Sequence, residues 1–243
     1  MKPIYKPSGR AKEYGELALN IYAGCNHGCT YCYAPLVLKK DRAEFHASVT
    51  PRKNIVEATK RQLDKEQITG KLIHLCFTCD PYPAMIDTMP TREVIKAIKA
   101  IGNNVQILTK GGVRAERDFD LLGEGDWFGV SISGDDESSY RKSEPNAADV
   151  YDRIMALRYS KAYESGIKTW VSCEPVIVPR MIFQMIEKYD FIDLFRIGKT
   201  NYCQSDIDWA GFGVECIRLC EKHGRNYHIK EDLRRIMETE NTP

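Results

Sequence analysis

The amino-acid sequence predicts an α/β fold built on parallel strands. Short apolar runs of strand length alternate with stretches in which apolar residues recur at helical spacing. The alternation gives about six strand–helix units and part of a seventh, and strands joined in this way pair in parallel through right-handed crossovers. A partial (β/α)6 barrel of the TIM type and a doubly wound sheet both fit this pattern. In either fold, the functional site lies beyond the carboxyl ends of the strands.

The predicted elements follow one another without a linker rich in Pro, Gly or Ser. The first helix takes Thr50 as its N-cap and Pro51 as its first helical residue. The next helix ends at Gly102, a residue type that commonly terminates helices. The strands are almost continuously apolar, which is typical of a sheet covered by helices. The predicted strands are residues 16–22, 71–78, 104–109, 127–133, 168–178, 191–198 and 225–230, and the predicted helices are residues 50–66, 91–102, 114–123, 147–166, 180–190, 207–224 and 231–240.

Composition limits the function classes. The chain has 243 residues and a net charge of +1, which neither requires nor excludes a nucleic-acid partner. No run of 18 apolar residues indicates a membrane span, and the first residues lack the apolar region of a signal peptide. We therefore expect a cytoplasmic protein. Nine cysteines are many for such a protein, and their odd number fits metal or redox chemistry better than a disulfide framework.

Three of the cysteines are clustered directly after the first predicted strand. Cys25, Cys29 and Cys32 have the spacing Cys-x3-Cys-x2-Cys. A [4Fe–4S] cluster usually takes four cysteines, so three would leave one iron open to another ligand. Two alternatives remain at this point. A zinc site could be completed by His27 or a distant cysteine, although no second CxxC half follows at zinc-finger spacing, or the three thiols could be unligated core residues.

The segment "GCNHGCTYCY" resembles the signature of the radical S-adenosylmethionine (SAM) enzymes, with Tyr31 at its aromatic position. The resemblance implies a partial (β/α)6 barrel over residues 16–200, with residues 1–15 as an N-terminal extension and residues 201–243 as a C-terminal extension packed on the same domain. It also implies a [4Fe–4S] cluster whose open iron binds SAM. Reductive cleavage of SAM would then give a 5′-deoxyadenosyl radical that abstracts a substrate hydrogen, with an electron donor such as flavodoxin or ferredoxin.

The segments "GCTYCY", "CFTCDPYP", "ILTKGG" and "GVSIS" end the first four predicted strands, and together they resemble the spore photolyase-like branch of this family. This resemblance implies that Tyr31 and Tyr33 line the site and that Lys110 pairs with the SAM carboxylate. It places Ser131 near the amino-acid or ribose part of SAM, with Ser133 as an alternative on the same face of the strand. The alternatives are packing within the loop for each tyrosine, contact with solvent for Lys110, and a hydrogen bond to its own backbone for Ser131.

The end of the second strand offers further candidates. Asp80 lies where the family binds the SAM amino group, although the family's Gly-Gly-Glu tripeptide is absent and an Asp-Pro turn is the alternative. Spore photolyase carries a hydrogen-donating cysteine in this region, so Cys76 and Cys79 are both candidates. The substrate is open between a nucleic acid, as in lesion repair or base modification, a peptide and a small molecule. A non-catalytic zinc or iron–sulfur binding module is the alternative of a different class.

Overall fold

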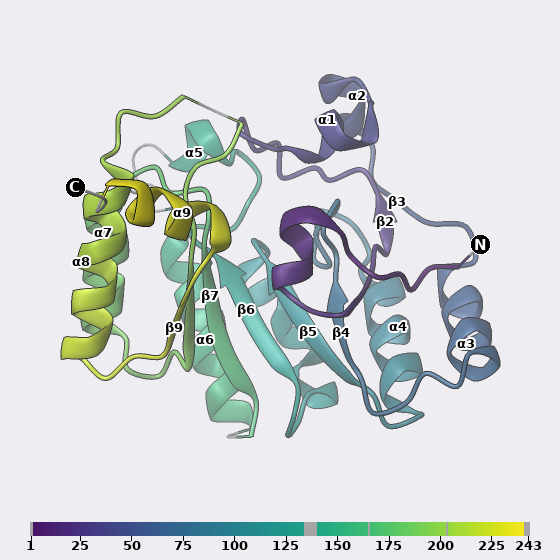
Figure 1. Ribbon diagram of the computed structural model, residues 1–243. Helices are drawn as coiled ribbons and strands as arrows, with labels where there is room; N and C mark the ends of the chain where they lie inside the picture. The colour runs from purple at the N-terminus through teal and green to yellow at the C-terminus, as the bar shows by residue number, and fades with distance from the viewer. Residues whose placement is uncertain (1, 134–139, 165, 203, 241–243) are drawn as a thin grey trace.

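The core of the computed structural model is a seven-stranded parallel sheet with the order β1-β4-β5-β6-β7-β8-β9 (Figure 1). The structure describes residues 2–133, 140–164, 166–202 and 204–240. A separate two-stranded antiparallel sheet pairs β2 with β3. The strands are β1 (Leu17–Leu19), β2 (Tyr22–Ala23), β3 (Thr50–Pro51), β4 (Leu72–Leu75), β5 (Asn104–Thr109), β6 (Trp127–Ser131), β7 (Lys168–Cys173), β8 (Leu194–Ile197) and β9 (Tyr227–Ile229).

The strand order decides between the two predicted architectures. Each strand of the large sheet pairs with the next one along the chain, so the order never reverses. A doubly wound sheet has a switch point where the order reverses, whereas a barrel is wound in one direction. The fold is therefore the open, partial barrel. Its helical segments are η1 (Gly9–Glu13), α1 (Ala34–Leu38), α2 (Arg42–Ala47), α3 (Ile55–Lys65), α4 (Met89–Lys99), η2 (Gly112–Leu121), α5 (Tyr140–Ser143), α6 (Val150–Tyr163), α7 (Pro179–Lys188), α8 (Trp209–Lys222) and α9 (Glu231–Glu240).

The two faces of the sheet differ in chemistry because successive side chains of a strand point to opposite faces. One face is apolar and packs against helices such as α4 and α6. Its fully buried side chains include Ile73, Val105, Phe128, Val171 and Phe195. The inner face carries polar and aromatic side chains at the alternate positions, and it is therefore not the continuous apolar surface that the strands suggest. These inner residues include His74, Gln106, Trp170, Ser172 and Arg196.

The N-terminal segment lies across this inner face (Figure 1). Tyr5 forms an isolated antiparallel bridge with Ala18 of β1. The ring of Tyr14 lies 5.6 Å from that of His74 and 5.8 Å from that of Trp170, measured between centroids. The guanidinium of Arg196 lies 5.2 Å from the centre of the Tyr14 ring. The segment thus closes the inner face with an aromatic side chain.

Several predicted boundaries are wrong. Thr50 and Pro51 do not begin a helix. They form strand β3, which pairs with β2, and α3 begins only at Ile55. Pro lacks a backbone donor but is tolerated in an edge strand, and here the return of the chain from the cysteine loop requires that pairing. The predicted strand 16–22 is also interrupted. The side chain of Asn20 accepts hydrogen bonds from the backbone N–H groups of Phe77 and Thr78, which ends the pairing of β1 with β4.

Other differences are local. The predicted helix 114–123 is the 3-10 helix η2, and helices α1, α2 and α5 were not predicted. Part of the segment between the predicted strand 127–133 and the predicted helix 147–166 lies outside the described residues, while β9 confirms the last predicted strand. None of the helices in the described ranges is long and apolar enough to cross a membrane.

Candidate metal and cofactor site

The three clustered cysteines lie on the loop between β2 and α1, at the carboxyl edge of the sheet. The unpredicted helix α2 holds this loop from one side. The guanidinium of Arg42 donates to the backbone oxygens of Cys29 (3.2 Å) and Cys32 (2.7 Å). The imidazole Nδ1 of His46 lies 2.7 Å from the backbone oxygen of Cys25. All three cysteine backbones are therefore fixed by side chains of one short helix.

Two other segments hold the loop from the opposite side. The side-chain amide of Asn26 donates to the backbone oxygen of Ala84 (2.5 Å) and accepts from its N–H group (3.1 Å). Asn146 donates its backbone N–H to the oxygen of His27 (3.1 Å) and its side-chain amide to that of Asn26 (2.8 Å). Gly24 has a φ of +84°, and a Cβ there would lie 1.9 Å from the backbone oxygen of Ser48. The loop is thus braced before any ligand binds.

The thiols are neutral in the protein alone. Burial raises the pKa of Cys25 and Cys32, and it raises the pKa of Cys29 to about 12 despite the nearby ammonium of Lys110. A metal centre is what would convert buried thiols of this kind to thiolates. Within the described ranges no three His, Cys, Asp or Glu side chains converge around one point. Soft thiolates on three positions fit an iron–sulfur cluster, in which each cysteine binds a different iron.

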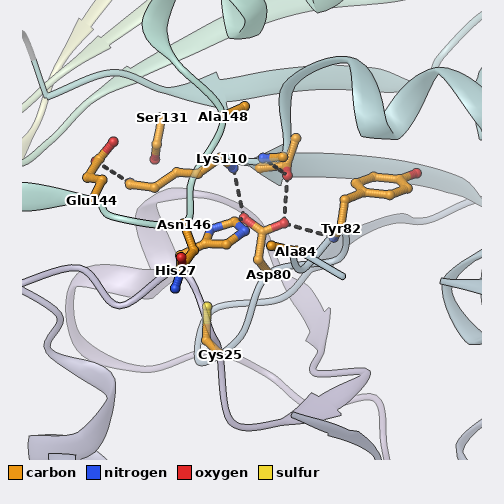
Figure 2. A network of polar contacts seen from close by, with 12 residues as sticks. Cys25, His27, Asp80, Tyr82, Ala84, Lys110, Ser131, Glu144, Asn146 and Ala148 are labelled. Carbon is orange, nitrogen blue, oxygen red and sulfur yellow. Dashed lines mark hydrogen bonds and ion pairs between the residues drawn. The ribbon is translucent and has the colours of Figure 1, made fainter. Parts of the chain in front are cut away.

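Asp80 ties the cysteine loop to the strand ends (Figure 2). Its Oδ1 accepts from the backbone N–H of Tyr82 (2.8 Å) and from the hydroxyl of Thr109 (2.6 Å), and its Oδ2 accepts from the backbone N–H of Lys110 (2.8 Å). The Nδ1 of His27 lies 3.6 Å from Oδ2. These three hydrogen bonds use both acceptor sites of Oδ1 and one of Oδ2. The geometry favours the turn-forming alternative, and contact with the SAM amino group stays a prediction.

His27 is buried beside Asp80 and also meets the helix η2. The Nη2 of Arg114 lies 3.2 Å from Nε2 of His27. Burial lowers the pKa of His27 to about 4, because desolvation outweighs the attraction of Asp80. A neutral imidazole that accepts from Arg114 at Nε2 carries its proton on Nδ1, facing Asp80. His27 therefore links the loop to two neighbouring elements.

The side chain of Lys110 runs from the end of β5 to Glu144 (Figure 2). Its Nζ lies 3.7 Å from Oε1 of Glu144 and 5.6 Å from the centre of the Tyr31 ring. The side chain is 14% exposed, and burial lowers the pKa of Lys110. The lysine is therefore not a solvated surface residue. The hydroxyl of Tyr31 is buried and has no hydrogen-bond partner among the described residues.

Glu144 and Arg153 were missed by the sequence analysis, and both are fully buried. Arg153 donates to Oε2 of Glu144, to the backbone oxygen of Ser131 (2.9 Å) and to that of Ala148 (2.8 Å). Burial raises the pKa of Glu144, and Arg153 opposes that shift. Arg153 thus fixes Glu144 against the end of β6. Nothing in the sequence indicated that these two side chains are buried, since charged residues in loops and helices are usually exposed.

The two predicted serines are both buried at the end of β6. Ser131 is the last residue of the strand, and its backbone oxygen is the one that Arg153 contacts. The hydroxyl of Ser133 has no partner in the described part of the chain. Ser131 thus lies beside Lys110 and Glu144 in space (Figure 2), and the contact of either serine with SAM stays a prediction.

Tyr33 links the cysteine loop to two distant segments. Its hydroxyl donates to the backbone oxygen of Phe77 (2.5 Å), and its ring stacks on that of Tyr202 at a centroid distance of 6.3 Å. Tyr202 in turn accepts a hydrogen bond from Arg10 (2.9 Å). The ring of Tyr33 is 37% exposed, so it forms part of the surface at the mouth of the barrel.

Cys76 and Cys79 lie together just after β4. Cys76 adopts a positive φ of 71°. Burial raises the pKa of Cys76. Cys76 belongs to the hydrophobic core, whereas Cys79 is only partly buried. Of the two candidate hydrogen donors, Cys79 is therefore the more accessible.

The fold and site define an open parallel barrel that carries a cysteine loop at the carboxyl edge of its sheet. Residues 19–190 match the Radical SAM superfamily, and the protein belongs to this family. The superfamily uses a [4Fe–4S] cluster and SAM, so family membership implies SAM cleavage chemistry.

Similar proteins extend this assignment. ORF301 of the Acidianus two-tailed virus is 30% identical over 258 residues, and the match covers 95% of this chain and 84% of the relative. A spore photoproduct lyase variant has a TM-score of 0.69 at 15% identity over 92% of this chain and 78% of its own. Streptococcus suis SuiB bound to S-adenosylmethionine has a TM-score of 0.65 at 12% identity over 87% and 49% of the two chains. These structural similarities confirm the predicted fold.

Proposed function

We propose that Cys25, Cys29 and Cys32 hold a [4Fe–4S] cluster whose open iron binds SAM, and that the protein abstracts a hydrogen atom from a substrate. The position of the cysteine loop carries this proposal. The loop is braced at the carboxyl edge of the barrel, and the buried ammonium of Lys110 lies beside it. Family membership supplies the chemistry, and the braced loop supplies a place for it.

When bound, the cluster supplies the electron that cleaves the sulfonium C–S bond of SAM, which yields methionine and a 5′-deoxyadenosyl radical. The residues of the chain bind SAM and shield the reactive intermediate from water. Lys110 offsets the carboxylate of SAM with its ammonium. Asp80 holds its own segment against the end of β5 through its hydrogen bonds. Tyr31 borders the Lys110 ammonium, and Tyr14 closes the inner face, which keeps water from a reactive intermediate.

The substrate side of the site is assigned by accessibility. Tyr33 is exposed at the mouth of the barrel, and Cys79 is the more accessible thiol of its pair. We assign these residues to the substrate side, where either can return a hydrogen atom to a product radical. Deuterium transfer into 5′-deoxyadenosine from labelled nucleotides, peptides or small molecules identifies the substrate class. A flavodoxin or ferredoxin is the expected electron donor.

Anaerobic reconstitution tests the cluster directly. The wild-type protein should bind about four irons per chain and, once reduced, convert SAM to 5′-deoxyadenosine. The variant Cys25→Ala/Cys29→Ala/Cys32→Ala should do neither. The matched control is Cys216→Ala/Cys220→Ala, because these two cysteines are buried in α8, outside the site. Conversion of SAM by the triple variant would contradict the proposal.

A further inference from the structure

The helices α1 and α2 stand above the carboxyl edge of the sheet, apart from the helices that cover the barrel (Figure 1). We call residues 34–53, which contain both helices and β3, the cysteine-loop lobe. The lobe begins two residues after Cys32, and its Arg42 donates to the backbone oxygens of Cys29 and Cys32. The lobe is therefore joined directly to the cysteine loop.

Three consecutive aliphatic side chains of α1 are exposed to solvent. The exposed fractions are 62% for Leu36, 50% for Val37 and 36% for Leu38. A single exposed aliphatic side chain is normal on a protein surface, whereas a contiguous group with a polar rim marks an interaction site. The helix α1 thus presents an apolar face that the described part of this chain leaves uncovered.

The charges around this apolar face are positive on balance. Residues 34–53 contain five lysines or arginines and two acidic residues, a net charge of +3, whereas the whole chain has a net charge of +1. Lys39 and Lys40 follow α1 directly, are exposed, and form no ion pair with another described residue. The carboxylate of Asp41 accepts from the backbone N–H of Glu44 (2.9 Å) as the cap of α2. An apolar centre with a positive rim complements an acidic protein surface.

The chemistry of the family indicates which acidic protein needs this position. SAM cleavage in the Radical SAM superfamily consumes an electron, so a reductant must reach the cysteine loop. Asn26 and Asn146 hold that loop on the side of the strand ends, where Lys110 lies (Figure 2). The lobe flanks the loop on the other side, so a protein docked there delivers an electron without entering the barrel. Electron-transfer complexes are small and weak, which suits a patch of this size.

We propose that the cysteine-loop lobe is the docking surface for the reductant, an acidic one-electron carrier protein. This inference rests on the proposed function, since it takes the cluster as the electron acceptor. The reduced carrier loses one electron, the oxidised cluster gains it, and no covalent bond forms or breaks. Leu36 and Val37 form the apolar centre of the contact. Lys39 and Lys40 attract the acidic surface of the carrier and accelerate the encounter.

Two double variants separate the charged part of the contact from the apolar part. Lys39→Asn/Lys40→Gln removes both charges, and asparagine is chosen because the backbone of Lys39 has a φ of 53°, which asparagine tolerates. Leu36→Gln/Val37→Gln replaces two exposed aliphatic side chains by polar residues that favour a helix. All four side chains are exposed, so neither variant disturbs a buried contact.

Matched control variants carry the same replacements outside the lobe. Lys60 and Lys65 are exposed on α3, and Val214 of α8 is 51% exposed. Lys60→Gln/Lys65→Gln therefore removes two surface charges, and Val214→Gln replaces an exposed aliphatic side chain, with the cysteine-loop lobe intact. Both helices lie away from the lobe in Figure 1.

Binding of oxidised flavodoxin to the reconstituted proteins, at low and high salt, tests the proposal without turnover. Lys39→Asn/Lys40→Gln should weaken binding about 3- to 30-fold at low salt, and the loss should shrink at high salt because salt screens exposed charges. Leu36→Gln/Val37→Gln should weaken binding about 10-fold at both salt concentrations. The two control variants should bind as wild type does. Stopped-flow reduction of the cluster by reduced flavodoxin should slow in the same order, whereas dithionite should reduce every variant at the wild-type rate.

The outcomes separate this inference from the proposed function. Wild type that does not convert SAM with dithionite contradicts the proposed function itself. If dithionite supports conversion, the docking surface alone is overturned when wild type does not bind flavodoxin, or when both lobe variants bind it as tightly as wild type. A lobe variant that dithionite no longer reduces also overturns it, because its residues would then support the cluster.

The oligomeric state excludes the other occupant of the apolar face. A wild-type dimer that Leu36→Gln/Val37→Gln converts to a monomer in analytical ultracentrifugation would overturn the proposal, because the face would then contact a second copy of the chain. Should a double variant not fold, Lys40→Gln and Leu36→Gln as single variants must show the same losses of flavodoxin binding to a smaller degree.

Discussion

The carboxyl edge of the barrel contains two largely buried lysine–glutamate pairs that differ in how closely the two charges approach each other. Lys230 contacts Glu174 directly and lies 3.4 Å from the hydroxyl of Tyr14. Lys110 stands 3.7 Å from Glu144 without a hydrogen bond between them. The first pair joins the ends of β7 and β9 to the N-terminal segment, so it serves the architecture. The second is an ion pair without a hydrogen bond, and it lies close to the ring of Tyr31 in the cysteine loop.

The largest expected effect is on the free energy of unfolding, which should depend on the Lys230–Glu174 pair much more than on the Lys110–Glu144 pair. Lys230→Met leaves the largely buried Glu174 carboxylate without its cation, which should lower the free energy of unfolding by about 3 kcal/mol, the lower end of the range for a broken buried pair, because Asn201 still donates to it. Lys110→Met should change it by about 1 kcal/mol or less, since Lys110 makes no hydrogen bond to Glu144, and Arg153 still pairs with that carboxylate. Urea unfolding of the two metal-free variants measures the difference. Equal losses would contradict the contrast.

Ligand-linked stability is the next largest effect. SAM at 100 times its dissociation constant should stabilise the reconstituted wild type by about 2.7 kcal/mol. At the same concentration Lys110→Met should gain much less, because its affinity for SAM is lower, whereas Glu174→Gln should gain as much as wild type. Thermal unfolding with and without SAM reports these shifts. If SAM stabilised Lys110→Met as much as wild type, Lys110 would not be part of the SAM-binding site.

A smaller effect tests the link between the two sides of the barrel mouth. Tyr33 of the cysteine loop stacks on Tyr202, which Arg10 joins to Asp232 of α9. A double-mutant cycle of Tyr33→Ala and Tyr202→Ala should give a coupling energy of about 0.5–1.5 kcal/mol. Urea unfolding of the four proteins provides the cycle. A coupling energy of zero would mean that the stack contributes nothing to closing the mouth.

The pH dependence of stability should have opposite signs for the two lysines, and this is the smallest effect. Burial lowers the pKa of Lys110, so the folded protein releases that proton first and stability rises with pH up to the unfolded value near 10.5. Burial also opposes the charge of Lys230, but Tyr14 and Glu174 together raise its pKa, so its stabilisation is lost as pH rises through the folded value. Unfolding of wild type, Lys110→Met and Lys230→Met between pH 8 and 11 gives each slope by difference. Slopes of the same sign would contradict this contrast.

The periodicity of apolar residues predicted the fold because it records which faces are buried. It placed the strands of the large sheet, but it missed the small β2–β3 sheet and could not choose between a barrel and a doubly wound sheet, which have the same local pattern. The boundary errors have a specific cause. Thr50 and Pro51 have the signature of a helix start, and tertiary pairing with Tyr22 and Ala23 overrides it.

The candidate site was predictable where chemistry is concentrated in a short motif, as in the cysteine loop. Glu144 escaped prediction because its loop is rich in charged residues, and only the fold shows that it is sealed from water. Arg153 escaped for the same reason, since an arginine in a polar helix is usually solvated. Glu144 and Arg153 contact Lys110 and Ser131, which lie at the ends of two strands. A local sequence pattern does not predict contacts between such distant residues.

The contact of the N-terminal segment with the last strand constrains how the chain is made. Tyr14 meets Lys230, which follows it by 216 residues, and Arg10 meets Asp232 across 222 residues. During synthesis the first segment leaves the ribosome long before these partners exist. Contacts between such distant residues form slowly, because loop closure must come first. The inner face of the barrel is therefore sealed last, and a ribosome stalled before Lys230 would carry a nascent chain whose Tyr14 and Glu174 still lack that partner.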